Sequence, residues 1–260
     1  MTQAVLFGLL GSSALVLGAL VGGRFQIPKK VLAAMLAFAA GALITALAFE
    51  LFEDAHEQGG LWRAGLGLMV GAVVFTFISA WLDRAAAPGG GDGAGDGSEK
   101  LDKEAATEGE PAAASSVKGA AGLALLAAVT LDGVPENVAL GVSLGGGTGG
   151  VALLGAIFVS NFPEALVGSA SMRAQGRSQG FVLLTWTSCA VLLTVAVVVG
   201  AGPLASAEPE TLSLPLAFAA GAVLASLADT LMPEAYEEGG PTVALATAAG
   251  FVLSYLLATL

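Results

Sequence analysis

Two stretches of the chain decide its fold, because each repeats the other: Leu36–Gly60 reads LAFAAGALITALAFELFEDAHEQGG, and Leu216–Gly240 reads LAFAAGAVLASLADTLMPEAYEEGG. Aligned without gaps at an offset of 180 residues, they are identical at 14 of 25 positions. The match continues beyond the apolar run, where Glu57 pairs with Glu237 and both copies end in Gly-Gly. Two unrelated apolar helices would resemble each other only in their apolar part. We therefore interpret the pair as an internal duplication.

The composition around this duplication is that of a membrane protein. Of the 260 residues, 55% are apolar and only 12% are charged, and the mean hydropathy is +0.82. Soluble domains carry about 25% charged residues. A net charge of −11 argues against a nucleic-acid partner. The single Cys189 excludes a disulfide within the chain, and the single His56 excludes a multi-histidine zinc site.

A membrane helix needs about 20 mostly apolar residues. Eight stretches qualify: Ala4–Val21, Val31–Leu51, Leu61–Trp81, Gly119–Leu144, Val151–Ser171, Phe181–Val199, Leu214–Met232 and Thr242–Leu260. Basic residues concentrate in cytoplasmic loops. With the N-terminus outside, the outer loops carry only Arg63, and the inner loops carry nine basic residues: Arg24, Lys29, Lys30, Arg84, Lys100, Lys103, Lys118, Arg173 and Arg177. We therefore expect an all-α polytopic protein of the cytoplasmic membrane, with eight transmembrane helices and both termini extracytoplasmic.

These helices are expected to form one membrane domain interrupted by a linker. Residues 1–84 hold helices one to three, and residues 118–260 hold helices four to eight. Residues 85–117, rich in Gly, Ala, Asp and Glu, are predicted to be a disordered cytoplasmic linker. In this topology the first copy of the repeat runs outward and the second runs inward, so the outer three-helix units are inverted around helices four and five. Inverted repeats are typical of secondary transporters, whose substrate binds near the midplane between them.

Helices four and five carry acids at depths where a carboxylate costs about 3 kcal/mol. Each contains a Pro-Glu pair, Pro135-Glu136 and Pro163-Glu164, and in each a polar residue precedes the glutamate by four positions and shares its helix face. Each proline removes a backbone donor and is expected to loosen the turn before it. These groups predict a midplane cation site formed by Asp132, Glu136, Ser160, Asn161 and Glu164.

Two further acids belong to the repeated helices. Glu50, toward the outer end of helix two, and Asp229, toward the inner end of helix seven, are candidates for the entrance and exit of an ion path. The same acids would also serve a proton or monovalent-cation pathway, or a membrane sensor that binds metal without transporting it. An enzyme is not expected, because the His-Glu-x-x-His motif is missing from the sequence. No cofactor is expected beyond a transported ion.

The eight spans and the paired Pro-Glu motifs together resemble the ZIP (Zrt-, Irt-like protein) family of divalent metal transporters. The family's motif in helix four is His-Asn-x-Pro-Glu-Gly. Here Asp132–Asn137 reads DGVPEN, so that Asp132 stands at the histidine position. In helix five, Ser160 and Asn161 fill the family's polar positions before Pro163 and Glu164.

The resemblance implies transport of a divalent metal cation, with zinc as first choice and then iron or manganese. It also implies import, a homodimer, and the lipid bilayer and metal ions as partners. The sequence departs from the family in two ways. Helix six offers no acid for a second metal, so a two-metal site is not supported. Aspartate in place of histidine makes the predicted ligands nearly all oxygen, which favours a harder cation than zinc.

Overall fold

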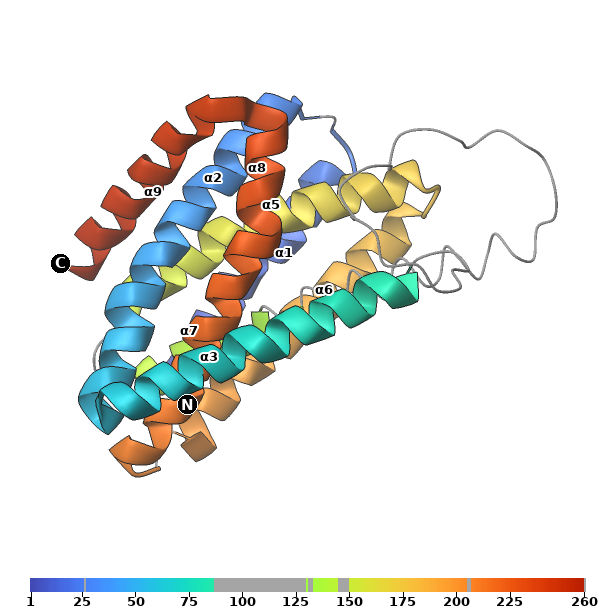
Figure 1. Ribbon diagram of the computed structural model, residues 1–260. Coiled ribbons are helices and arrows are strands. Elements are labelled where there is room, and N and C mark those ends of the chain that lie inside the picture. The colour runs from blue at the N-terminus through green and yellow to red at the C-terminus, as the bar shows by residue number, and fades with distance from the viewer. Residues whose placement is uncertain (26, 87–129, 131–132, 145–149, 205–206, 260) are drawn as a thin grey trace.

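The computed structural model describes residues 1–25, 27–86, 130, 133–144, 150–204 and 207–259, and no strand occurs among them (Figure 1). The elements in chain order are α1 (Thr2–Gly22), α2 (Lys29–Ala46), the π-helix η1 (Leu47–Phe52), α3 (Glu53–Ala86), a helix over 133–144, α5 (Val151–Ala174), α6 (Gln179–Val199), the π-helix η2 (Gly200–Leu204), α7 (Pro209–Ser226), the π-helix η3 (Leu227–Leu231), α8 (Met232–Gly239), the short η4 (Gly240–Thr242) and α9 (Val243–Ala258). The expected all-α class is confirmed. The predicted linker overlaps the end of α3 at residues 85 and 86, and its remainder lies outside the described residues.

Five helical stretches of the described chain are long and apolar enough to cross a membrane: Thr2–Gly22, Lys29–Trp81, Val151–Ala174, Gln179–Leu204 and Pro209–Ala258. The chain therefore has the helices of a multi-pass membrane protein. Two of the five stretches, with 53 and 50 residues, are much longer than one crossing requires. At 1.5 Å per residue each would reach roughly 75–80 Å as a straight rod, against a hydrocarbon core of about 30 Å.

Both long stretches are broken at matching glycines. Gly60 adopts φ 76° and ψ 167°, and Gly240 adopts φ 64° and ψ −161°. The two positions are 180 residues apart, like the copies of the repeat. Side chains other than hydrogen are disfavoured in this part of φ/ψ space, so glycine permits the chain to change direction here. Figure 1 shows α3 leaving the end of α2 at a sharp angle, and α9 folding back beside α2.

The two copies of the repeat lie antiparallel to each other. At one end, the Lys29 ammonium at the start of α2 forms an ion pair of 2.7 Å with Glu238 at the end of α8. At the other end, Ser213 Oγ near the start of α7 donates to Ala55 O, just after η1, at 2.6 Å. Each copy also contains a π-helix at the matching place, η1 in the first and η3 in the second. The copies therefore share local backbone features while running in opposite directions.

The first helix of each copy packs closely on a helix that follows the other copy: α2 packs on α9, and α7 packs on α3. A methyl group added at Gly41 of α2 would lie 1.9 Å from Thr247 O of α9, and one added at Gly221 of α7 would lie 1.9 Å from Leu68 O of α3. Gly41 and Gly221 are matching positions of the repeat. Backbones approach this closely only where a side chain is missing, as in other membrane helix pairs.

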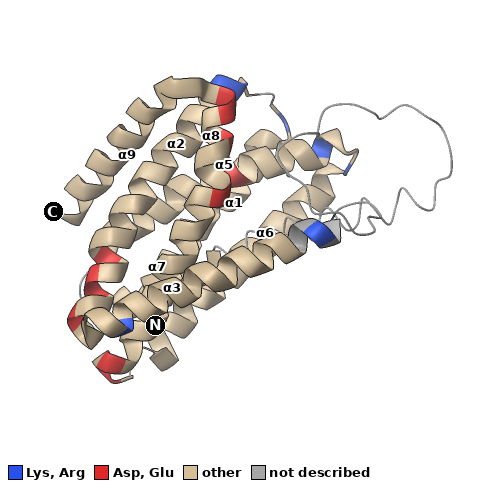
Figure 2. Cartoon of the chain, viewed as in Figure 1, with Lys and Arg blue, Asp and Glu red and all other residues tan. Residues whose placement is uncertain are grey.

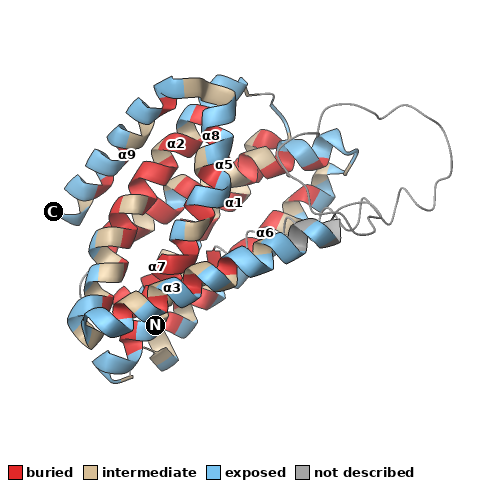
Figure 3. Ribbon diagram, viewed as in Figure 1, coloured by how far each residue is buried: buried red, intermediate tan, exposed pale blue. Residues whose placement is uncertain are grey.

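Charge and burial follow the same arrangement. Figure 2 shows Lys and Arg at the start of α2, at the end of α3 and around the turn between α5 and α6, while the middle parts of most helices carry no charge. Figure 3 shows the buried residues along the facing sides of the helices and the exposed ones on the outer sides. Many exposed side chains are large and apolar, among them Trp62 and Leu66 of α3 and Leu245 of α9. Such an apolar outer surface suits contact with lipid.

Candidate functional site

A small internal cavity lies where α2, the helix over 133–144, α5, α7 and η3 meet. Its lining residues are Leu43, Gly133, Glu136, Asn161, Glu164, Val223, Ser226, Leu227 and Leu231. All of them are buried except Glu164, which is half-buried. The cavity volume is about 10 Å³ for a water-sized sphere, which leaves room for about one such particle. We call it the central cavity.

The central cavity brings together Glu136, Asn161 and Glu164 of the five predicted site residues. Ser160 is buried on α5, but its hydroxyl donates to Ile157 O at 3.1 Å and it is not among the residues that line the cavity. The fifth residue, Asp132, lies outside the described residues.

Helix geometry explains why Asn161 and Glu164 lie together at the central cavity. Asn161 and Glu164 are one turn apart on α5 and therefore lie on the same side of the helix. α5 stays α-helical from Val151 to Ala174 although Pro163 lies inside it, so the expected loosening does not interrupt the helix. On the helix over 133–144, Asn137 is not among the residues that line the cavity, and it donates its Nδ2 hydrogen to Gly133 O at 2.8 Å. Its amide thus bonds to its own helix.

The electrostatic character of the central cavity is acidic. It is lined by two carboxylates, from Glu136 and Glu164, and none of the described residues around it is Lys, Arg or His. Glu136 is only 5% exposed. A carboxylate this deeply buried is costly to keep ionised unless a cation or a hydrogen-bond donor neutralises it. The arrangement therefore suits a proton or a small cation.

A complete cluster of strong metal ligands is not found in the described part of the chain. Within it, no three or more His, Cys, Asp or Glu side chains lie close enough together to hold a metal ion. The central cavity offers two carboxylates, the Asn161 amide and the Ser226 hydroxyl. Sequence reasoning overlooked Ser226. The alignment of the two copies pairs it with Ala46, and this polar difference could have marked it.

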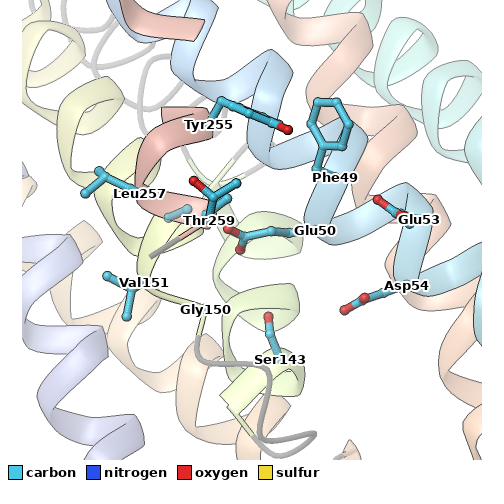
Figure 4. A pocket seen from close by; sticks show the side chains of 12 residues that line it. Phe49, Glu50, Glu53, Asp54, Ser143, Gly150, Val151, Tyr255, Leu257 and Thr259 are labelled. Atoms are coloured by element: carbon cyan, nitrogen blue, oxygen red, sulfur yellow. The ribbon is translucent and has the colours of Figure 1, made fainter. Parts of the chain in front are cut away.

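A second, larger pocket lies near the start of α5 and carries more acids. Its volume is about 410 Å³, and it is lined by Phe49, Glu50, Glu53, Asp54, Ser143, Gly150, Val151, Ala152, Tyr255, Leu257, Ala258 and Thr259 (Figure 4). Three acids on two successive turns of one segment, with hydroxyls from Ser143, Tyr255 and Thr259, make its polar part. We call it the acidic pocket. Of its acids, Glu50 is the path residue predicted from the sequence.

Glu50 is held in the acidic pocket by the backbone of α5. Its Oε2 accepts a hydrogen bond from Leu153 N at 3.1 Å. Leu153 lies in the first turn of α5, where backbone N–H groups have no partner within the helix and the helix dipole favours negative charge. The carboxylate of Glu50 thus connects η1 to the start of the helix that carries Glu164.

The other predicted path residue, Asp229, lies apart from both cavities. It is exposed on η3, and its Oδ2 accepts a hydrogen bond from Ser79 Oγ of α3 at 3.0 Å. It lines neither the central cavity nor the acidic pocket. The prediction of an exit role for Asp229 stays a prediction.

Comparison with known proteins adds no relative: no family model matches this chain, and no curated protein matches it significantly.

Proposed function

We propose that this chain is a membrane transporter for a divalent metal cation, zinc, iron or manganese, and that the ion passes through the central cavity between Glu136 and Glu164. The observation that carries the proposal is the meeting of these two carboxylates with Asn161 in one buried cavity. Buried acids persist in membrane helices mainly where they bind or conduct charge. The alignment of the Pro-Glu motifs with those of the ZIP family supports the same function.

The proposed topology has eight crossings. Breaks at Gly60 and Gly240 divide the two longest apolar stretches into two crossings each. The three remaining long helices and the predicted fourth span Gly119–Leu144, of which the structure describes residues 130 and 133–144, complete the proposed eight. Basic residues near the start of α2, the end of α3 and the α5–α6 turn support a cytoplasmic location for those ends.

An inverted repeat is part of the proposal. The antiparallel copies, with their matching π-helices and glycines, support a two-fold relation between the α2–α3 unit and the α7–α9 unit. Leu43 and Val223 are matching positions, and both line the central cavity. The ion site would therefore lie close to the axis between the copies, where transporters of this kind bind substrate.

The size of the central cavity supports a dehydrated ion as the cargo. Hard divalent cations bind oxygen at about 2.0–2.6 Å, whereas water hydrogen-bonds to oxygen at about 2.7–2.8 Å. A cavity with room for one water-sized particle thus accepts the bare ion and not its hydration shell. Carboxylate and amide oxygens would replace the lost water. The acidic pocket around Glu50 would concentrate hydrated cations before they enter.

Uptake into proteoliposomes tests this function. Glu136→Gln and Glu164→Gln keep the shape of the side chain and remove one charge each, so each should reduce metal uptake to near background. The control is Glu237→Gln, an exposed glutamate at the end of the second copy, which should transport like the parent. Normal metal uptake by both cavity variants would refute the proposal.

The same experiment separates the rival function. A proton or monovalent-cation pathway through these acids would give a pH change or sodium flux that depends on Glu136 and Glu164, without metal uptake. A sensor would bind metal without any flux. Import and a homodimer, which the resemblance implies, would be measured in the same liposomes by the direction of flux and by cross-linking.

A further inference from the structure

Helix α7 places a hydroxyl at the central cavity. Ser226, the last residue of α7, is 2% exposed and lines the central cavity with Glu136, Asn161 and Glu164. It lies neither on the helix over 133–144 nor on α5, and its counterpart in the first copy of the repeat is Ala46. The second copy therefore contributes a polar atom to the cavity at a position where the first copy has a methyl group.

Thr230, one turn after Ser226, contacts both the backbone and the side chain of Ser226. Thr230 Oγ1 donates a hydrogen bond to Ser226 O at 2.7 Å. Thr230 Oγ1 also lies 3.4 Å from Ser226 Oγ, a contact in which either oxygen could be the donor. A hydroxyl oxygen carries two lone pairs besides its hydrogen, so the Ser226 hydroxyl has the chemistry of an oxygen ligand.

The orientation of the Asn161 amide is determined by a hydrogen bond to α1. Its Nδ2 donates to Gly11 O of α1 at 3.3 Å. The amide nitrogen therefore faces α1, and the amide oxygen is the atom left to face other neighbours. Among the described lining residues, the oxygen-bearing side chains are two carboxylates, one amide and one hydroxyl. Neither imidazole nor thiol is among them.

We propose that Ser226 Oγ is a direct ligand of the transported ion and biases the site toward hard, oxygen-preferring divalent cations of the Mn²⁺ type. This inference rests on the proposed function and specifies its substrate class. Oxygen donors suit Mn²⁺ and Mg²⁺, whereas thiolate selects softer ions. Changing the one polar side chain that α7 contributes to the lining should therefore change the preference between ions while both carboxylates remain.

Calorimetry on the purified full-length protein tests the inference, with Mn²⁺ and Cd²⁺ as the probes. Ser226→Ala should weaken Mn²⁺ binding about tenfold, the lower end of the range for losing a metal-site partner. Ser226→Cys should weaken Mn²⁺ similarly and strengthen Cd²⁺ about tenfold, because thiolate is the softer donor. Ser226→Thr keeps the hydroxyl and should bind Mn²⁺ within roughly threefold of the parent.

Matched variants come from Ser169 of α5, which is fully buried but does not line the central cavity. Ser169→Ala and Ser169→Cys should leave both affinities within about threefold of the parent. Equal effects of the Ser226 and Ser169 substitutions would overturn the inference while leaving the transporter intact. If Glu136→Gln and Glu164→Gln bind both ions like the parent, the proposed function fails, and the role of Ser226 fails with it. If Ser226→Cys does not fold, the Mn²⁺ affinities of the Ala and Thr variants show whether the Ser226 hydroxyl is a ligand.

Discussion

Replacing Gly41 or Gly221 by alanine should destabilise the protein to a similar extent, because both glycines mark equivalent close approaches between helices. The added methyl at either position would lie 1.9 Å from a backbone oxygen of the neighbouring helix. Ordinary contact begins near 3.4 Å, so each helix pair would have to separate by about 1.5 Å. The obstacle is backbone, which cannot rotate away as a side chain can.

The cost of such overpacking is typically about 1–3 kcal/mol. It outweighs the gain of roughly 0.5–1 kcal/mol from replacing glycine by alanine in a helix. For a chain of this size 1 kcal/mol shifts the melting temperature by about 2–4 °C. We therefore expect Tm to fall by several degrees for Gly41→Ala and Gly221→Ala alike, measured by thermal unfolding of the purified protein in detergent.

Gly65 and Gly180 provide the matched controls. Each is a helical glycine with no atom within 4 Å of the added methyl. Gly65→Ala and Gly180→Ala should leave Tm unchanged or raise it slightly, because only the helix propensity changes. The reasoning would be refuted if Gly41→Ala and Gly221→Ala melted like these controls. A large loss at one of the pair and none at the other would refute the equivalence of the two interfaces.

Three further predictions concern topology, the ion path and the turns. With cysteine placed singly at the exposed, matching positions Glu57 and Glu237, a membrane-impermeant thiol reagent should label intact cells only at position 57; labelling of both from outside would contradict the inverted topology. Glu50→Gln should lower metal uptake at limiting ion concentration more than at saturation, because a vestibule charge acts mainly on local ion concentration; a flat loss in the concentration series would contradict this role. Gly60→Ala and Gly240→Ala should each cost about 1–3 kcal/mol through their backbone conformation, and a Tm equal to the parent's would show that the turns are not strained.

The helical class could be predicted because it depends on local sequence. Apolar runs of about 20 residues predict membrane helices, and the matching ends of Leu36–Gly60 and Leu216–Gly240 predicted equivalent structures before any contact was known. The breaks at Gly60 and Gly240 could be expected from the Gly-Gly pairs that end both copies. The π-helices η1 and η3 could not be predicted, because Leu47–Phe52 and Leu227–Leu231 carry no proline or glycine that would mark a change of hydrogen-bond pattern.

Three of the five predicted site residues line the central cavity, and local sequence explains why only some of them do. Spacing along one helix placed Asn161 and Glu164 on the same side of α5, and similarity between the two Pro-Glu motifs added Glu136. Ser226 was overlooked because its position in the cavity depends on how α7 packs against α5, and serine in an apolar helix is common. Ser160, placed in the site by its spacing, instead bonds to Ile157 O within α5. Helix periodicity determines the side of a helix but not which neighbour covers that side.

The relation between the central cavity and the repeat bears on how transport would work. Leu43 and Val223 occupy matching positions and line the same cavity, so the axis of the proposed inverted repeat would pass close to it. The two Pro-Glu helices supply the charges, while the two copies supply an apolar boundary on either side. The boundary is not symmetric, because Ser226 stands where the first copy has Ala46. An ion bound by Glu136, Glu164 and Ser226 would therefore be attached to the second copy and would only touch the first. When the copies move relative to each other, the ion should stay with α7, which is why we expect substitution of Ser226 to alter ion preference and substitution of Ala46 by serine to leave it unchanged.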